Sequence, residues 1–222
     1  MKTFKSHFGF TLAEVLITLG IIGVVAAITL PSVINKAQKF ILKQQFKKSI
    51  SIVSNAVRKA YADLEFVPNC AYNAYGGGEV FNNDCKLLNN TLINNLKTVK
   101  YCPNKALEKG CIANIKGADT VSMANDPDLS EEDAKKMHKG YSNFHESKIH
   151  NNIPAWVLAD GQVIMLYGIT TPLYLIDING LKGPNKWGYD IYTFILRDFK
   201  LICVYDFIEP GGTSCSTLLK NN

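Results

Sequence analysis

The sequence lacks the short motifs on which most enzyme assignments rest. Its six cysteines include no Cys-x-x-Cys pair, and the glycine run 76–78 is not followed by Lys-Ser or Lys-Thr, which disfavours a phosphate-binding loop. No nucleophile–base motif, paired-acid signature or metal-ligand spacing stands out. A membrane-tethered enzyme is therefore the least favoured class, and we expect a protein that is not an enzyme.

The chain also has little excess charge. Its net charge is +5, and Lys2 and Lys5 lie in a short head before a long apolar run, so +3 remains without them. This excess is too small to predict nucleic-acid binding by itself. Hydrophobic residues make up 47% of the 222 residues and charged residues 19%, which predicts a folded chain with a core.

All six cysteines follow the apolar run. An even number of cysteines in loop-like surroundings favours disulfides, formed in an oxidising compartment, over zinc. Among the possible connectivities we prefer the local one, which pairs Cys70 with Cys85, Cys102 with Cys111, and Cys203 with Cys215.

The apolar run from Phe10 to Leu30 contains one acid, Glu14. A carboxylate in hydrocarbon costs several kcal/mol, roughly 3 to more than 10. A secretory signal peptide would explain the basic head and offers residues 25–27 as a cleavage site, but this run is longer than usual and contains an acid. A plain transmembrane anchor has the right length, but a lone spanning helix offers Glu14 no partner.

A third interpretation rests on the motif GFTLAE at residues 9–14, with the basic head before it and the apolar run after it. This stretch resembles the N-terminal segment of type IV pilins and of the pseudopilins of type II secretion systems. The resemblance implies that a prepilin peptidase cuts between Gly9 and Phe10, on the cytoplasmic side, and methylates Phe10. Pro31 matches a proline that commonly lies near the end of the membrane half of the family's first helix.

The same resemblance gives Glu14 a partner. Cleavage places an amine on Phe10, and a carboxylate on one subunit can satisfy the amine of the next as helices stack in a medium of low dielectric. The alternative is an acid near the membrane interface that reaches water. The assembly residues implied are Thr11, Leu12, Glu14 and Pro31.

We predict an α+β fold in which a long helix packs on a pilin-like antiparallel head. The parts are a leader at 1–9, a transmembrane and assembly helix at 10–31, its amphipathic continuation at 32–65, and a globular head at 66–222. Two helices broken at Pro31 are the alternative. Apolar residues three or four apart mark the continuation: Phe46, Ile50, Val53, Val57, Tyr61 and Leu64.

The head begins with an irregular cysteine-containing region at 66–115, where a short helix is expected at 86–97. A polar insertion follows at 116–152, with a surface helix started by the capping pair Ser130 and Asp133. The histidines of this insertion are expected to be solvated rather than bound to metal; they are His138, His145 and His150.

A C-terminal antiparallel sheet is predicted at 154–206. Asp160-Gly161 between apolar segments indicates a hairpin, and short links between consecutive strands indicate a meander beside the helix, an α+β layout. Asp198-Phe199 is expected to turn the last pair. The expected strands cover 155–158, 162–167, 173–178, 191–197 and 200–205.

A loop between two of these strands is the one candidate metal site. Side-chain and backbone oxygens in a glycine-rich loop are what calcium accepts, and major pseudopilins carry a calcium in a C-terminal loop, although this loop does not align with theirs. It is no EF-hand, and a structural loop with capped backbone groups is preferred, so no cofactor is required. The candidate calcium ligands are Asp177, Asn179 and Asp190.

Together these features predict a structural subunit anchored once in the bacterial inner membrane, with its head outside the cytoplasm. Its partners would be membrane lipid, the prepilin peptidase, an inner-membrane assembly platform and other subunits, with which it polymerises into a type IV pilus or a secretion pseudopilus. A membrane-anchored secreted protein is one alternative. A minor pilin that takes up DNA is another, with a basic patch of Lys97, Lys100, Lys105 and Lys109.

Overall fold

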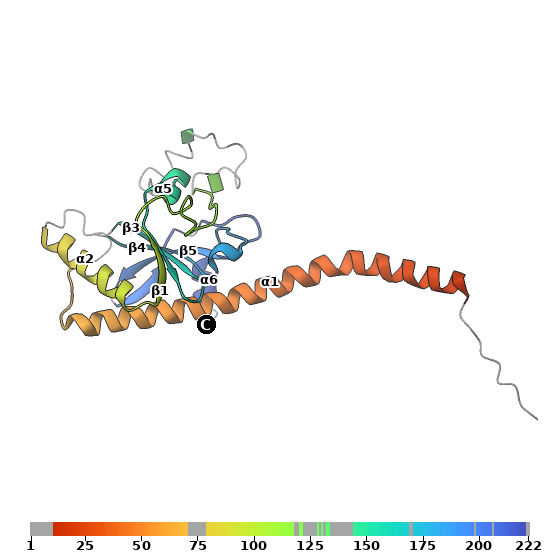
Figure 1. Cartoon of the computed structure of the whole chain (residues 1–222), viewed down its shortest axis with the longest axis horizontal. Coiled ribbons are helices and arrows are strands. Elements are labelled where there is room, and N and C mark those ends of the chain that lie inside the picture. The colour runs from red at the N-terminus through yellow and green to blue at the C-terminus, as the bar shows by residue number, and fades with distance from the viewer. Residues whose placement is uncertain are drawn as a thin grey trace, which may run out of the picture. The chain divides into compact units, whose positions relative to one another are not determined.

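The computed structural model describes residues 11–70, 79–117, 120–121, 144–168, 171–197, 199–205 and 207–220, together with residues 128, 130, 132 and 133. The chain divides into two compact units, residues 1–41 and 42–222. The elements in chain order are α1 (Leu12–Leu64), α2 (Glu79–Asn94), β1 (Thr98–Cys102), α5 (Glu146–Asn151), β2 (Ala155–Leu158), β3 (Val163–Gly168), β4 (Thr171–Asp177), η2 (Gly180–Lys182), β5 (Ile191–Arg197), β6 (Lys200–Cys203) and α6 (Cys215–Lys220) (Figure 1).

Helix α1 is continuous over 53 residues and contains Pro31. A proline inside a helix removes one backbone hydrogen bond, but here it does not end the helix, so the alternative of two helices broken at this residue is wrong. The helix ends at Leu64, and Glu65 follows with a φ of 58°. This left-handed conformation is the usual way in which a helix terminates.

The second unit is built on one six-stranded antiparallel meander, with strands in the order β1 to β6 (Figure 1). The predicted hairpin at Asp160-Gly161 joins β2 to β3, and Gly161 has the positive φ of 91° that such a turn favours. Strand β1 was not predicted, because only one of its five side chains is buried and its sequence TVKYC shows no buried stripe.

The first face of the sheet is covered by the second half of α1 and by α2. Phe46, Val53 and Val57 of α1 are buried there, as the helical spacing predicted, and the ring of Phe46 lies 4.9 Å from that of Tyr192 in an edge-on contact. Helix α2 begins earlier than the helix expected at 86–97. Its Asn89 accepts a hydrogen bond from the hydroxyl of buried Tyr174, at 2.5 Å.

The second face carries its own core. Alternate residues of β3 point to opposite faces, so Ile164 contributes to the first core and Met165 to the second. The second core includes three residues from the predicted polar insertion, which is therefore partly a covering layer rather than a surface appendage: Val121, Phe144 and Ile149.

His150 belongs to this layer and corrects the expectation of solvated histidines. It is only 7% exposed, and its Nε2 accepts a hydrogen bond from the Ile115 N–H at 3.2 Å. The predicted capping pair is present, because the Asp133 N–H donates to the Ser130 Oγ at 3.1 Å. His138 and most of the surface helix expected to follow Ser130 lie outside the described residues.

Three disulfides tie the irregular parts of the head to its regular elements. They pair Cys70 with Cys85, Cys102 with Cys111, and Cys203 with Cys215, which is the local connectivity preferred from the sequence. The last of these attaches β6 to α6, a short helix that the sequence analysis did not predict.

Candidate functional site: the amino-terminal assembly segment

Helix α1 begins with a reciprocal pair of hydrogen bonds between Thr11 and Glu14. The Thr11 N–H and the Thr11 hydroxyl both donate to the Glu14 Oε2, each at 2.8 Å, and the Glu14 N–H donates to the Thr11 Oγ1 at 3.2 Å. This is a capping box, which satisfies N–H groups that a helix start leaves without partners. A threonine followed three residues later by a glutamate is the sequence signal of such a box, although no capping box was predicted here.

The capping box changes the account of Glu14. The expectation that a lone helix offers this carboxylate no partner is wrong, because Thr11 supplies two donors from the same chain. The carboxylate is also exposed and lies in the first turn of α1, where the partial positive charge of the helix end favours an anion. Gly9 and Phe10, the predicted cleavage and methylation residues, lie outside the described residues.

The segment after Glu14 is an apolar surface that the single chain leaves uncovered. From Thr11 to Ile41 every residue is exposed except Ala26, which is half-buried, so the predicted assembly residues Leu12 and Pro31 are exposed as well. Helix α1 is long and apolar enough at this end to cross a membrane, by length and composition.

Between Glu14 and Pro31, the only polar side chains on this surface are those of Thr18 and Thr29. The hydroxyls of Thr18 and Thr29 each donate to a backbone carbonyl of the same helix, those of Val15 and Val25, at 2.9 Å. Backbone and hydroxyl groups satisfied within one helix are what a hydrocarbon environment requires. The segment therefore suits either lipid or the apolar faces of similar helices.

The candidate calcium loop lies between β4 and β5. Pairing of these strands places Asp177 opposite Ile191, next to Asp190. The Asp177 Oδ1 accepts from the N–H groups of Asn179 and Gly180 at 3.1 and 2.7 Å. This is the backbone-capping role of a structural loop, and the positive φ of 59° at Gly180 fits the same interpretation.

Asp190 caps the other side of the loop. Its two carboxylate oxygens accept from the N–H groups of Asn185 and Lys186, both at 2.7 Å. Asn179 in turn donates from its side chain to the carbonyl of Gly183 at 2.7 Å. The three predicted ligands are thus brought into one loop, and Asn185 joins them.

Three oxygens of this loop are buried and have no hydrogen-bond partner among the residues that the structure describes: the Oδ2 of Asp177 and the Oδ1 atoms of Asn179 and Asn185. Burial raises the pKa of Asp177 well above its usual range, and the nearby charge of Asp190 adds to the effect. Burial also raises the pKa of Asp190. Unpaired oxygens beside two carboxylates fit a hard cation such as calcium.

No cluster of three acidic, histidine or cysteine side chains forms a metal centre among the described residues. An ion in the β4–β5 loop would therefore combine two carboxylates with amide oxygens. This donor set suits calcium better than zinc.

The predicted basic patch is largely engaged in local contacts. Lys105 pairs with Glu108 at 3.0 Å, the Lys100 ammonium donates to the carbonyls of Lys109 and Gly110, and the Lys109 ammonium donates to the Asn104 side chain at 2.7 Å. The ion pair with Glu108 offsets the charge of Lys105, and the hydrogen bonds hold Lys100 and Lys109 against local oxygens instead of leaving them extended toward a nucleic-acid backbone.

Comparison with known proteins bears on the amino-terminal segment alone. Residues 4–30 match the family model of the prokaryotic N-terminal methylation motif. No curated protein and no solved structure gives a significant match to the chain. The matched residues include the capping box and most of the uncovered apolar surface. The chain thus carries at residues 4–30 the N-terminal signature of type IV pilins and pseudopilins.

Proposed function

We propose that the protein is a precursor, which a prepilin peptidase cuts between Gly9 and Phe10. The mature subunit then polymerises into a type IV pilus or a type II secretion pseudopilus. The observation that supports this most is the methylation motif at residues 4–30. The uncovered apolar half of α1 agrees with it, because this surface needs lipid before assembly and neighbouring helices afterwards.

Glu14 has the central part in this proposal. The peptide nitrogen of Phe10 becomes an amine only after cleavage, and the carboxylate of Glu14 on a neighbouring subunit is its partner. Thr11 donates two hydrogen bonds to this carboxylate and holds it at the helix start in the free subunit. The pair forms as helices stack, where low dielectric strengthens it, and it sets their axial register.

The proposed location follows from the disulfides and the basic head. Three disulfides support a location of the second unit in an oxidising compartment outside the cytoplasm. Lys2 and Lys5 precede the apolar run and favour a cytoplasmic amino terminus. The chain therefore crosses the inner membrane once before an assembly platform extracts it into a filament.

The role of Glu14 is tested by two substitutions that separate charge from helix capping. Glu14→Ala removes both, whereas Glu14→Gln removes the charge and keeps a side chain that can serve in a capping box. Both variants should be processed at Gly9 and give little filament relative to the amount of processed subunit. Normal filament yield from Glu14→Gln would show that capping alone is needed, and the register role would be wrong.

The second part of the proposal is a calcium ion in the β4–β5 loop, held by Asp177, Asn179 and Asp190 with help from Asn185. The three buried oxygens without partners support it. At free calcium one hundred times the dissociation constant, binding stabilises the fold by about 2.7 kcal/mol, or about 5–11 °C in melting temperature for a unit of this size.

Thermal melts of the full chain in detergent, with calcium and with EGTA, test this part. Asp177→Asn should abolish the calcium-dependent shift. Equal melting temperatures of the wild-type protein in the two solutions would leave the loop purely structural.

We do not extend the proposal to DNA uptake or to an enzymatic activity. Three of the four lysines of the predicted patch, Lys100, Lys105 and Lys109, have local partners, and the motif at residues 4–30 points to a structural subunit.

A further inference from the structure

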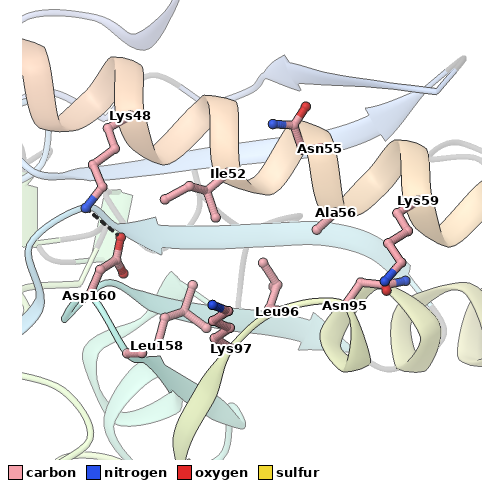
Figure 2. A pocket seen from close by; sticks show the side chains of 11 residues that line it. Lys48, Ile52, Asn55, Ala56, Lys59, Asn95, Leu96, Lys97, Leu158 and Asp160 are labelled. Atoms are coloured by element: carbon pink, nitrogen blue, oxygen red, sulfur yellow. Dashed lines mark ion pairs between the residues drawn. The ribbon is translucent and has the colours of Figure 1, made fainter.

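The second unit has a hollow of about 470 Å³ between α1 on one side and, on the other, residues 95–97, which connect α2 to β1, and residues 158–160 at the β2–β3 turn. Its volume falls within the range of binding pockets, about 300–1,000 Å³. Figure 2 shows Ile52 and Ala56 of α1 facing it from one side, with Leu96 and Leu158 on the other. These four side chains give the hollow an apolar floor.

The rim of the hollow is positively charged. Lys48 is paired with Asp160 at 3.1 Å (Figure 2), and Asp160 also accepts from the Gln162 side chain at 2.5 Å. Lys59 and Lys97 line the hollow and form no ion pair with any residue that the structure describes. An occupant that combines an apolar body with a carboxylate would satisfy both the floor and the rim.

The chain itself exposes a segment of this composition just after α1. Phe66 is 47% exposed and Val67 is 70% exposed, and they follow the exposed Glu65. Several other exposed apolar side chains of the second unit lie beside lysines instead, as Leu87 does beside Lys86 and Leu181 beside Lys182. Phe199 stands between Asp198 and Lys200 in the sequence, and Ile202 has no charged residue next to it.

We propose that residues 65–67 of one copy dock into the hollow of the next copy. Phe66 and Val67 cover the apolar floor, and the Glu65 carboxylate pairs with Lys59 and Lys97 at the rim. Charge complementarity favours this segment, because Glu65 adds a negative charge to a rim with two lysines that have no ion-pair partner in the described part of the chain.

This contact joins two different patches of the same chain, so it is heterologous. A heterologous contact that does not close into a ring continues into an open helical filament. The proposal rests on the proposed function and adds to it a contact between heads, separate from the contact between the apolar helices.

Charge-reversal substitutions test the docking. The full chain carrying each substitution is produced in cells together with a prepilin peptidase and an assembly system, and the filament yield is measured. Glu65→Lys and Lys97→Glu should each lower the filament yield about tenfold or more, because each places like charges together at a cost of more than about 1.4 kcal/mol. The double variant with both substitutions should recover a yield within about twofold of wild type. Lys86→Glu is the matched control, at an exposed lysine outside the hollow, and should leave the yield unchanged.

A photo-cross-linking amino acid at position 66 gives a second readout that does not depend on yield. Irradiated filaments should contain a covalent dimer in which position 66 is joined to a peptide containing residues 52–59 or 95–97. A cross-link to another peptide, to lipid or to a different protein would overturn the docking, as would a double variant that fails to recover. If the wild-type chain forms no filament at all, the proposed function itself is overturned, and this outcome is distinct from filaments that form without the cross-link.

Discussion

Phe46 is a large side chain of α1 that is fully buried against the sheet. Its ring lies edge-on to Tyr192 at 4.9 Å and within 6.4 Å of Phe194, so truncation leaves a cavity between the helix and the sheet. Phe46→Ala should destabilise the fold by about 3–5 kcal/mol. For a unit of this size that lowers the melting temperature by about 6–20 °C.

Phe40 provides the matched control on the same helix, because it is 64% exposed. Phe40→Ala should change the stability of the second unit by no more than about 0.5 kcal/mol. Tryptophan fluorescence of the full chain in detergent is a suitable assay, since both tryptophans lie in the second unit. A shift below about 3 °C for Phe46→Ala, or equal shifts for the two variants, would refute the packing described here.

Two further predictions concern the β4–β5 loop. Gly180→Ala should lower the free energy of unfolding by at least about 2 kcal/mol, because Gly180 has a φ of 59° and an added Cβ would lie 2.2 Å from the Gly161 carbonyl oxygen. Gly161→Ala is the control: an added Cβ at Gly161 would meet open space, so this substitution should destabilise the fold less in the same thermal melt. In EGTA, the raised pKa of Asp177 means that its charged form opposes folding, so stability should increase as pH falls through the folded pKa toward the unfolded value of about 3.9. The melting temperature of wild type relative to Asp177→Asn should therefore be higher at pH 5 than at pH 8, and a constant difference would contradict the buried carboxylate.

Helix α1 and five of the six strands could be predicted because burial leaves a period in the sequence. Phe46, Val53 and Val57 repeat at helical spacing, and β5, which the structure places at Ile191–Arg197, coincides with the predicted segment. Tight turns such as Asp160-Gly161 then fix which strands pair. These signals are local, so a single sequence carries them.

The parts that were missed depend on contacts between distant segments. Strand β1 is defined by pairing with β2, although four of its five side chains are exposed. His150 is buried and accepts a hydrogen bond from the Ile115 N–H, 35 residues away in the chain, and no local pattern marks that contact. The sequence around Phe144 and Ile149 is polar and its few apolar residues are widely spaced, so it predicts a surface insertion rather than a buried layer.

Some parts of the candidate site could likewise be predicted from the sequence, and others could not. The motif around Glu14 could be recognised in the sequence because it is short and contiguous. The spacing of Thr11 and Glu14 also predicts the capping box. The hollow lined by Lys59, Lys97 and Leu158 could not be predicted, because its walls come from three separate stretches of the chain.

The most direct test of the account is the mass of the mature protein isolated from cells that contain a prepilin peptidase. We predict a chain that has lost residues 1–9, begins at Phe10 and carries one added methyl group on its terminal amine, with three disulfides intact. Fragmentation should place the methyl group on Phe10. A chain cut after Ala27, or one that retains residues 1–9, would contradict the central claim.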